Sequence, residues 1–104
     1  MVCVTDVPVG RLTELEDTPL LGFTIRGREV LLARHGNTWS AIGNVCTHEH
    51  CLLSNGRIIG ESVQCPCHGS MFSLRTGEAK HWPATDPVPV YPVAVRGGEV
   101  FIEV

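Results

Sequence analysis

Apolar residues of this chain occur in short runs between glycine turns, a pattern that predicts β-strands. Residues 20–26 and 29–34 are two such runs on either side of Gly27, and together they predict a β-hairpin. Residues 37–43 follow a turn at Gly36 and predict a third strand. The N-terminal part of the chain is therefore expected to form an antiparallel sheet.

A second hairpin is predicted near the C-terminus. Residues 88–96 and 99–104 flank a pair of glycines, and the latter segment alternates between aliphatic residues and others, as a half-buried strand does. Three prolines lie in or beside the first segment: Pro87, Pro89 and Pro92. Because proline cannot donate a backbone hydrogen bond, that segment is expected to be an edge strand or an irregular one.

Helical signals are weak, and only residues 11–17 are expected to form a turn or two of helix. Eleven glycines and seven prolines are spread over short segments, which is typical of a small antiparallel β-sandwich or barrel. A length of 104 residues fits one domain, residues 1–104, with one core. The predicted fold class is therefore all-β.

Composition and charge exclude several classes of protein. With 43% hydrophobic and 18% charged residues, the chain is neither disordered nor membrane-spanning, and no apolar run reaches the length that a bilayer requires. The N-terminus has no basic leader and no long apolar stretch, so a cytoplasmic location is expected. A net charge of −3 gives no electrostatic reason to bind nucleic acid.

Residues 44–84 differ in character from both groups of strands. They contain four of the five cysteines and four of the five histidines. Their apolar residues are too scattered to make a good core of their own, so the segment is expected to fold around a non-protein group. We expect this segment to be inserted into the β scaffold, which holds its two ends together.

Two short motifs within this segment have the spacing of a metal site. Cys46-Thr-His48 and Cys65-Pro-Cys-His68 each offer one thiolate and one imidazole, and residues 49–64 separate them. In a reducing compartment, such a combination of cysteine and histidine indicates a metal more often than a disulfide framework. A compact loop also suits sulfide-bridged iron, because its backbone amides can hydrogen-bond to the sulfurs.

These motifs resemble the Rieske [2Fe–2S] signature, in which two histidines replace two cysteines on one iron. The similarity extends over almost the whole chain and includes Asp6-Val-Pro-Val-Gly10, Trp39-Ser-Ala41, Thr76-Gly77 and Tyr91-Pro-Val93. The chain is similar to the small Rieske-type ferredoxins of multicomponent aromatic ring-hydroxylating dioxygenases, such as those of carbazole, biphenyl and naphthalene systems.

The resemblance implies the Rieske fold, a small antiparallel β scaffold with an inserted two-loop cluster-binding subdomain at about residues 44–84. It also implies one [2Fe–2S] cluster per chain. Cys46 and Cys65 would bind the inner iron, and His48 and His68 the outer iron. The alternative is a Cys₂His₂ zinc site, since zinc accepts the same ligands. Zinc fingers usually place the two cysteines together and the two histidines together, whereas each motif here has one of each.

Cys51 and Cys67 depart from the pattern of the dioxygenase ferredoxins and match that of the respiratory and photosynthetic Rieske proteins. In those relatives the two cysteines form a disulfide between the cluster loops. The alternative is two free, buried thiols that behave as small apolar residues. A reducing compartment disfavours the disulfide, whereas the proximity that the cluster enforces favours it.

Ser70 matches a serine whose hydroxyl bonds to a cluster sulfur in the high-potential relatives, and Phe72 stands where those relatives have a tyrosine. In those relatives the serine hydroxyl and the tyrosine hydroxyl each donate a hydrogen bond that raises the reduction potential. Phe72 has no hydroxyl, so the potential of this protein is expected in the lower part of the Rieske range. The alternative is that the Ser70 hydroxyl serves only its local turn.

Four further residues are weaker candidates. His50 and Trp82 lie in the cluster segment, where each is either a contact for a partner or a side chain that is solvated or packed on its own loop. His35 is expected to be an exposed turn residue, and Cys3 a passive thiol of the first strand.

The expected function is one-electron transfer. An NAD(P)H-dependent, flavin-containing ferredoxin reductase would supply the electron, and the terminal Rieske oxygenase of the dioxygenase system would receive it. No substrate pocket or acid–base pair is indicated, so the chain is not expected to be an enzyme by itself. Two alternatives stay open: a Rieske subunit of another oxidase or respiratory-type complex, and a zinc-stabilised interaction module.

Overall fold

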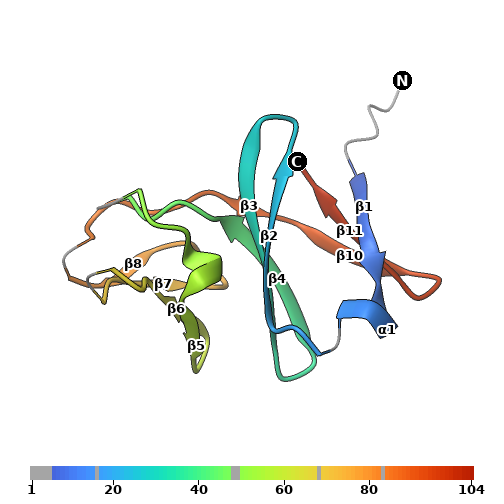
Figure 1. The fold of residues 1–104 in the computed structure, drawn as a ribbon, viewed down its shortest axis with the longest axis horizontal. Helices are drawn as coiled ribbons and strands as arrows, with labels where there is room; N and C mark the ends of the chain where they lie inside the picture. The colour runs from blue at the N-terminus through green and yellow to red at the C-terminus, as the bar shows by residue number, and fades with distance from the viewer. Residues whose placement is uncertain (1–5, 16, 48–49, 68, 83) are drawn as a thin grey trace.

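The computed structural model describes residues 6–15, 17–47, 50–67, 69–82 and 84–104, and these form three antiparallel sheets (Figure 1). The first sheet has three strands in the order β1 (Asp6–Arg11), β11 (Glu99–Glu103) and β10 (Val93–Arg96). It contains the predicted C-terminal hairpin, formed by β10 and β11. The sheet also brings the start of the described chain beside its end.

The second sheet contains the hairpin and the third strand that the N-terminal pattern predicts. Its four strands lie in the order β2 (Leu20–Ile25), β3 (Arg28–His35), β4 (Thr38–Gly43) and β9 (Val90–Tyr91). Arg26 and Gly27 join β2 to β3, and both have positive φ angles, 52° and 77°. A two-residue turn of this kind matches the twist of the strands that it connects, which explains why a glycine marks the hairpin.

The proline-rich C-terminal segment is irregular, as the sequence predicts. Pro92 divides it into β9 and β10, and these two short strands belong to different sheets. Each of the two lies at the edge of its sheet, where a missing backbone donor does not interrupt a ladder. The segment therefore connects the two sheets of the scaffold.

The weak helical signal also corresponds to structure. The helix α1 (Leu12–Leu15) is a single turn after β1, and the carboxylate Oε1 of Glu14 accepts a hydrogen bond from the backbone N–H of Arg11 at 3.1 Å. In the part of the chain that the structure describes, no helix is long and apolar enough to cross a membrane.

A third sheet lies between β4 and β9 in the sequence, and the sequence analysis did not predict it. A 3₁₀ turn, η1 (Leu53–Asn55), leads into strands β5 (Arg57–Ile59), β6 (Ser62–Gln64), β7 (Met71–Ser73) and β8 (Ala79–His81). Each of these strands has three residues. Three residues are too few to show the alternation of apolar and polar positions from which a strand is inferred.

Strand β3 is buried on both of its faces and separates two hydrophobic cores. Val30 and Leu32 pack on one face with Val100 and Ile102 of the first sheet. The side chains that alternate with them point to the other face, toward residues 44–84. Both faces of one strand therefore hold the scaffold and the inserted segment together.

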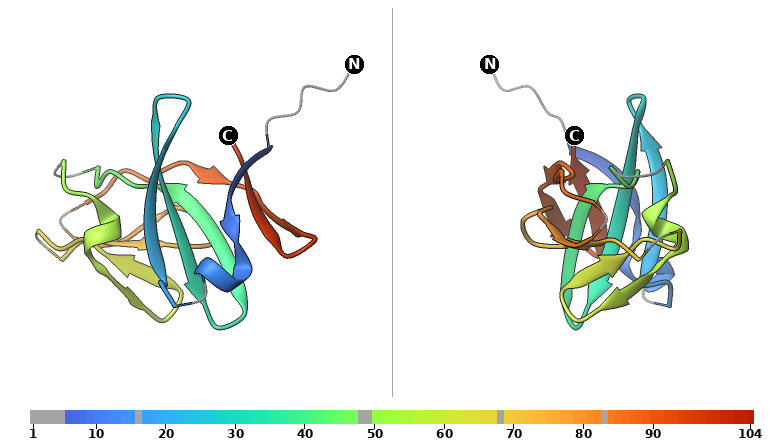
Figure 2. Two further views of the ribbon diagram at one scale, coloured as in Figure 1. Left: turned by 45° about the vertical axis from the view of Figure 1, so that its right-hand side comes forward. Right: turned by 90° about the vertical axis from the view of Figure 1, so that its left-hand side faces the viewer.

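Residues 44–84 share a hydrophobic core with β3 and its neighbours in the scaffold. Leu53, Val63 and Phe72 have no exposed surface, and they pack with Leu31 of β3. The inserted segment is thus fixed to the scaffold by protein contacts. Its loops lie at the end of the molecule away from β1 and the C-terminus (Figures 1 and 2).

Candidate metal centre

The first loop of the candidate site, residues 46–51, is closed at its base by backbone contacts. The backbone N–H of Cys46 donates a hydrogen bond to the carbonyl oxygen of Cys51 at 2.9 Å. Directly outside this pair, Val45 and Leu52 form an antiparallel bridge. The loop therefore leaves β4 and returns to η1 as a compact unit that begins with a cysteine.

The second loop, residues 65–70, is built in the same way. The backbone N–H of Cys65 donates to the carbonyl oxygen of Ser70 at 2.7 Å, so this loop also begins with a cysteine and is closed after six residues. It connects β6 to β7, whose adjacent residues Gln64 and Met71 are paired. Gly69 has a φ of 79°, which a glycine adopts without strain.

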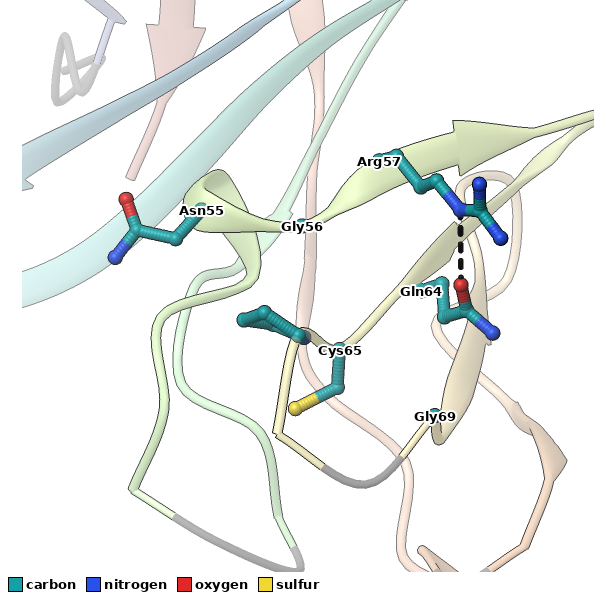
Figure 3. Close-up of a pocket in the computed structure, with 7 residues that line it drawn as sticks. Asn55, Gly56, Arg57, Gln64, Cys65 and Gly69 are labelled. Atoms are coloured by element: carbon teal, nitrogen blue, oxygen red, sulfur yellow. Dashed lines mark hydrogen bonds between the residues drawn. The ribbon is translucent and has the colours of Figure 1, made fainter.

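Both candidate thiols are shielded from solvent. Cys46 and Cys65 are each 2% exposed, and they belong to the same hydrophobic core as Phe72. Figure 3 shows the sulfur of Cys65 directed away from a surface pair in which the Nε–H of Arg57 donates to Oε1 of Gln64 at 3.0 Å. Two buried thiols, each at the start of a closed loop, are a donor set suited to a thiolate-bound metal centre.

An open hollow of about 320 Å³ lies beside Cys65. It is lined by Asn55, Gly56, Arg57, Gln64, Cys65, Pro66 and Gly69 (Figure 3). Its walls are two neighbouring strands and the second loop, and the lining side chains include no acid–base pair. The hollow is therefore part of the surroundings of the second loop.

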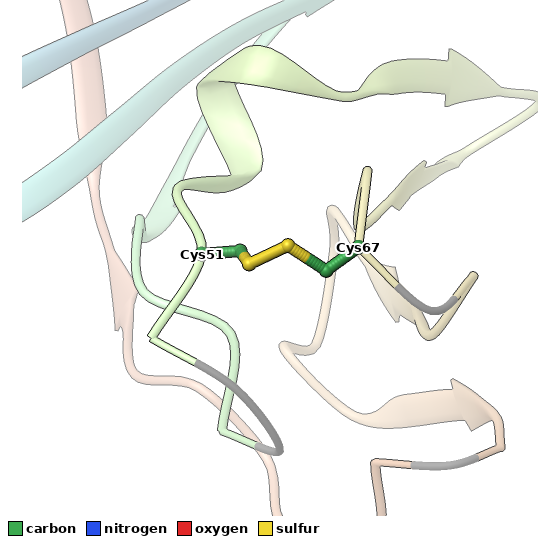
Figure 4. The surroundings of a disulfide bond; sticks show 2 residues. All are labelled: Cys51 and Cys67. Carbon is green, nitrogen blue, oxygen red and sulfur yellow. A yellow bond between two sulfur atoms is a disulfide. The ribbon is translucent and has the colours of Figure 1, made fainter.

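The structure places Cys51 and Cys67 in a disulfide, one of the two alternatives that the sequence leaves open (Figure 4). Their Cα atoms are 6.5 Å apart, within the range that a disulfide spans. The bond joins the first loop to the second. The sulfur atoms of Cys51, Cys65 and Cys67 all lie within 4.8 Å of one another.

A third loop, residues 82–86, is linked to both of the others by side-chain hydroxyl groups. The hydroxyl oxygen of Ser70 in the second loop accepts a hydrogen bond from the backbone N–H of Ala84 at 3.0 Å. The hydroxyl of Thr47 in the first loop donates to the carbonyl oxygen of Asp86 at 2.7 Å. Together with the disulfide, these two bonds connect the three loops pairwise.

The contact of Ser70 is therefore one between loops, and not one within its own turn. Ser70 is fully buried, and its oxygen acts as the acceptor toward Ala84, so the hydroxyl hydrogen remains to be donated elsewhere. Donation of that hydrogen to a cluster sulfur stays a prediction. Phe72 is fully buried in the core below the loops.

The two predicted histidine ligands, His48 and His68, lie outside the described residues, as does Cys3. His50 is exposed in the first loop, and the Trp82 side chain is 75% exposed in the third. The prediction for His35 is wrong.

His35 is not an exposed turn residue, because it is the last residue of β3 and is half-buried. Its Nε2 atom lies 3.1 Å from the hydroxyl oxygen of Ser40. Sequence reasoning missed Thr47 as a residue of the site. The only available signal was a hydroxyl between Cys46 and the next proposed ligand, and its partner Asp86 is 39 residues away.

Comparison with known proteins decides between iron–sulfur and zinc for this donor set. The family model for the Rieske [2Fe-2S] domain matches residues 5–92. The chain belongs to the Rieske [2Fe–2S] domain family. This confirms the cofactor type predicted from the sequence and leaves no support for the zinc alternative. The Rieske fold is confirmed as well, by the solved structures that the chain resembles.

Similar proteins include ferredoxins of dioxygenase systems. The 3-phenylpropionate/cinnamic acid dioxygenase ferredoxin subunit of Escherichia coli (strain K12) is 36% identical over 96% of this chain and 87% of its own length. The ferredoxin of carbazole 1,9a-dioxygenase from Nocardioides aromaticivorans IC177 has 34% identity and a TM-score of 0.89, covering 95% of this chain and 97% of that one.

A third similar structure contains a partner. It is a complex of reduced oxygenase and oxidized ferredoxin in carbazole 1,9a-dioxygenase, with 28% identity and a TM-score of 0.89 over 95% of this chain and 93% of that one. The agreement over nearly the full length of these chains shows that the Rieske ferredoxin fold accounts for the whole described structure.

Proposed function

We propose that this chain carries single electrons within an aromatic ring-hydroxylating dioxygenase system. An NAD(P)H-dependent, flavin-containing reductase supplies the electron, and a terminal Rieske oxygenase receives it. The observation that carries the proposal is the pair of closed six-residue loops, each beginning with a buried cysteine, in a chain of the Rieske family. Like the ferredoxins that it resembles, the chain is an electron-carrier component and not an enzyme by itself.

The proposed ligands are Cys46 and Cys65 on one iron and His48 and His68 on the other. When bound, a [2Fe–2S] cluster of this type supplies reversible one-electron oxidation and reduction. The chain's own contribution is to hold two thiolates in a dry core and to fix the loops around them. Exclusion of water matters because the surroundings of a metal site set its solvent access and reduction potential.

A Rieske subunit of a respiratory-type complex is the second candidate. The disulfide between Cys51 and Cys67 favours it, because the sequence pattern of those two cysteines is that of the respiratory proteins. The relatives favour the ferredoxin role, because this chain covers 87% of a dioxygenase ferredoxin subunit and 97% of the carbazole dioxygenase ferredoxin. We therefore assign the oxygenase as its electron acceptor. A cytoplasmic location is part of the proposal.

The docking surface for the oxygenase is proposed to lie on the three loops. The complex of oxygenase and ferredoxin in the carbazole system supports an oxygenase partner. The exposed side chains of His50 and Trp82 lie on the first and third loops, at the same end of the molecule. An electron passes most readily where the cluster is nearest to the partner, so contacts near these loops serve the transfer.

Purified protein provides the test of this function. We expect equal amounts of iron and sulfide, a Rieske-type electron paramagnetic resonance signal after reduction, and oxygenase turnover that requires this chain. His48→Cys and His68→Cys should each abolish the signal, whereas the control His81→Ala should keep it. A colourless protein would overturn the cofactor assignment. An unchanged signal in either ligand variant would overturn the ligand assignment.

A further inference from the structure

We propose that Cys51, Cys65 and Cys67 form a thiol–disulfide exchange site in the chain without its cluster. In that form the Cys65 thiol attacks the disulfide and converts the Cys51–Cys67 bond into a Cys51–Cys65 bond. Two observations support the exchange. A disulfide joins the two loops, and the sulfur of Cys65 lies within 4.8 Å of both sulfurs of that disulfide. Disulfides isomerise by attack of a thiolate on one of the bonded sulfurs.

The folded backbone keeps the three sulfurs together. The backbone N–H of Cys65 donates a hydrogen bond to the carbonyl oxygen of Ser70, which fixes Cys65. The carbonyl oxygen of Cys51 accepts a hydrogen bond from the backbone N–H of Cys46, which fixes Cys51. Both residues also pack in or against the same hydrophobic core. Rotation of side chains within a fixed backbone can therefore bring the attacking sulfur to the disulfide without opening either loop.

The step balances without any added oxidant or reductant. In the net step, the Cys65 sulfur loses its proton and forms a bond with Sγ of Cys51. The bond between Cys51 and Cys67 breaks, and its electron pair leaves with the sulfur of Cys67, which takes up a proton. One disulfide and one thiol are present before and after the step, so no net electrons are exchanged.

Attack on Cys51 is favoured over attack on Cys67 for two reasons. A bond between Cys65 and Cys67 would close a small ring across Pro66, whose φ is fixed by its own ring. Attack on Cys51 also releases Cys67, which is exposed, whereas Cys65 is buried and Cys51 half-buried. A leaving thiolate is more stable in water than in an apolar core.

The consequence for the cluster rests on the proposed function, in which Cys65 is an iron ligand. The exchanged chain keeps a covalent link between its loops but has no Cys65 thiol to bind iron. A bound cluster occupies that thiol and prevents the exchange. Cluster loading then draws on the chains in which Cys65 is a thiol, and a thiol reductant, which opens the Cys51–Cys65 bond and restores the ligand, should speed it.

The test begins with the holoprotein in a Cys3→Ser background. Iron is removed by a chelator without oxygen or added thiol, and samples are alkylated at intervals, digested with trypsin and analysed by tandem mass spectrometry. The peptides 35–57 and 58–75 stay linked in either form, so the position of the alkyl group distinguishes them. We expect the label to move from Cys65 to Cys67 with time, until the two disulfide forms reach equilibrium.

Two variants provide a matched control. Cys46→Ser and Cys65→Ser each remove one proposed ligand, but only the second removes the attacking thiol. Because neither variant should hold a cluster, the exchange needs no chelator in them. Part of the Cys46→Ser chains should carry label on Cys67 and no Cys65→Ser chains should, in a proportion that does not depend on protein concentration. Label that stays on Cys65 in both the parent and Cys46→Ser would overturn the exchange. A cluster that assembles in Cys65→Ser would instead overturn the ligand assignment, whatever the exchange does.

Discussion

The hydroxyl oxygen of Ser70 accepts a hydrogen bond from the backbone N–H of Ala84 at 3.0 Å, and this bond joins the second loop to the third. Ser70 is fully buried and Ala84 is 5% exposed, so water cannot replace either partner. A buried backbone N–H that loses its acceptor retains the full cost of its desolvation. The third loop is therefore expected to depend on this one hydroxyl.

Replacement of this serine should loosen the third loop. In Ser70→Ala the N–H of Ala84 has no acceptor, and we expect the free energy of unfolding to fall by about 1–3 kcal/mol. We also expect faster loss of the cluster well below the unfolding temperature, because the third loop no longer holds the second loop in place. Urea unfolding and the decay of visible absorbance measure the two effects.

Ser73→Ala is the matched control for that variant. Ser73 is 7% exposed, and its hydroxyl oxygen accepts hydrogen bonds from the backbone N–H groups of Arg75 and Thr76, both at 3.1 Å. These bonds lie in the turn after β7 and do not reach the third loop. The control should lose stability and keep its cluster lifetime. Equal acceleration of cluster loss in both variants would show that Ser70 acts through global stability alone.

Thr47→Val removes the link between the first and third loops and keeps the shape of the side chain. The hydrogen bond to the carbonyl oxygen of Asp86 is exposed, so the variant should lose only about 1 kcal/mol of stability. Iron should nevertheless leave faster in the presence of a chelator, because the loops separate more often. Thr24→Val is the control, since the Thr24 hydroxyl donates to Glu29 at 3.0 Å within the distant β2–β3 hairpin. Identical rates of iron loss in the two variants would contradict a role for Thr47.

The double variant Cys51→Ala, Cys67→Ala should destabilise the cluster-free chain more than the holoprotein. The disulfide joins residues separated by 16 positions. In the chain-entropy model, a disulfide that closes a loop of that length raises the free energy of unfolding by about 3 kcal/mol when nothing else closes the loop. In the holoprotein, the proposed ligands Cys46 and Cys65 would close nearly the same stretch through the cluster, so the disulfide should add less there.

Urea unfolding of both forms, followed by circular dichroism, measures this difference. Cluster decay on heating should also be faster in the double variant than in the parent. The variant Cys3→Ala changes a cysteine far from the motif in sequence and is the control. A loss of stability that is equal with and without the cluster would show that the ligands and the disulfide do not close the same loop.

Trp82 should contribute to binding of the oxygenase and not to folding. Its side chain is 75% exposed on the third loop, so Trp82→Ala should change the free energy of unfolding by less than about 0.5 kcal/mol. Loss of an aromatic contact at the centre of an interface costs about 1–2 kcal/mol or more, which should raise the KM for the ferredoxin roughly tenfold. Steady-state oxygenase turnover against ferredoxin concentration measures that constant.

Val95→Ala is the corresponding control. Val95 is 44% exposed on β10, in the sheet at the opposite end of the molecule, and its replacement should leave the KM unchanged. If Trp82→Ala and Val95→Ala behave alike, the oxygenase does not contact the third loop through this ring.

The sequence by itself determined the features that depend on neighbouring residues. Both hairpins, the single helical turn and the irregular proline segment follow from local pattern, because turns and backbone donors act over a few positions. The cofactor type was predictable from the spacing of Cys46, Cys65 and the histidines near them, because each proposed pair of ligands lies within one short motif. Family membership, which rests on the same motifs, was accessible for the same reason.

Only the tertiary structure decided which distant groups meet. Thr47 and Asp86 are 39 residues apart, and no local pattern identifies a hydroxyl donor with its carbonyl acceptor at that distance. The disulfide between Cys51 and Cys67 required that two loops face each other, and the third sheet required a core shared with β3. The physical reason is common to all three. A hydroxyl, a thiol or a three-residue strand has many possible partners in the sequence, and burial against one folded surface selects a single one.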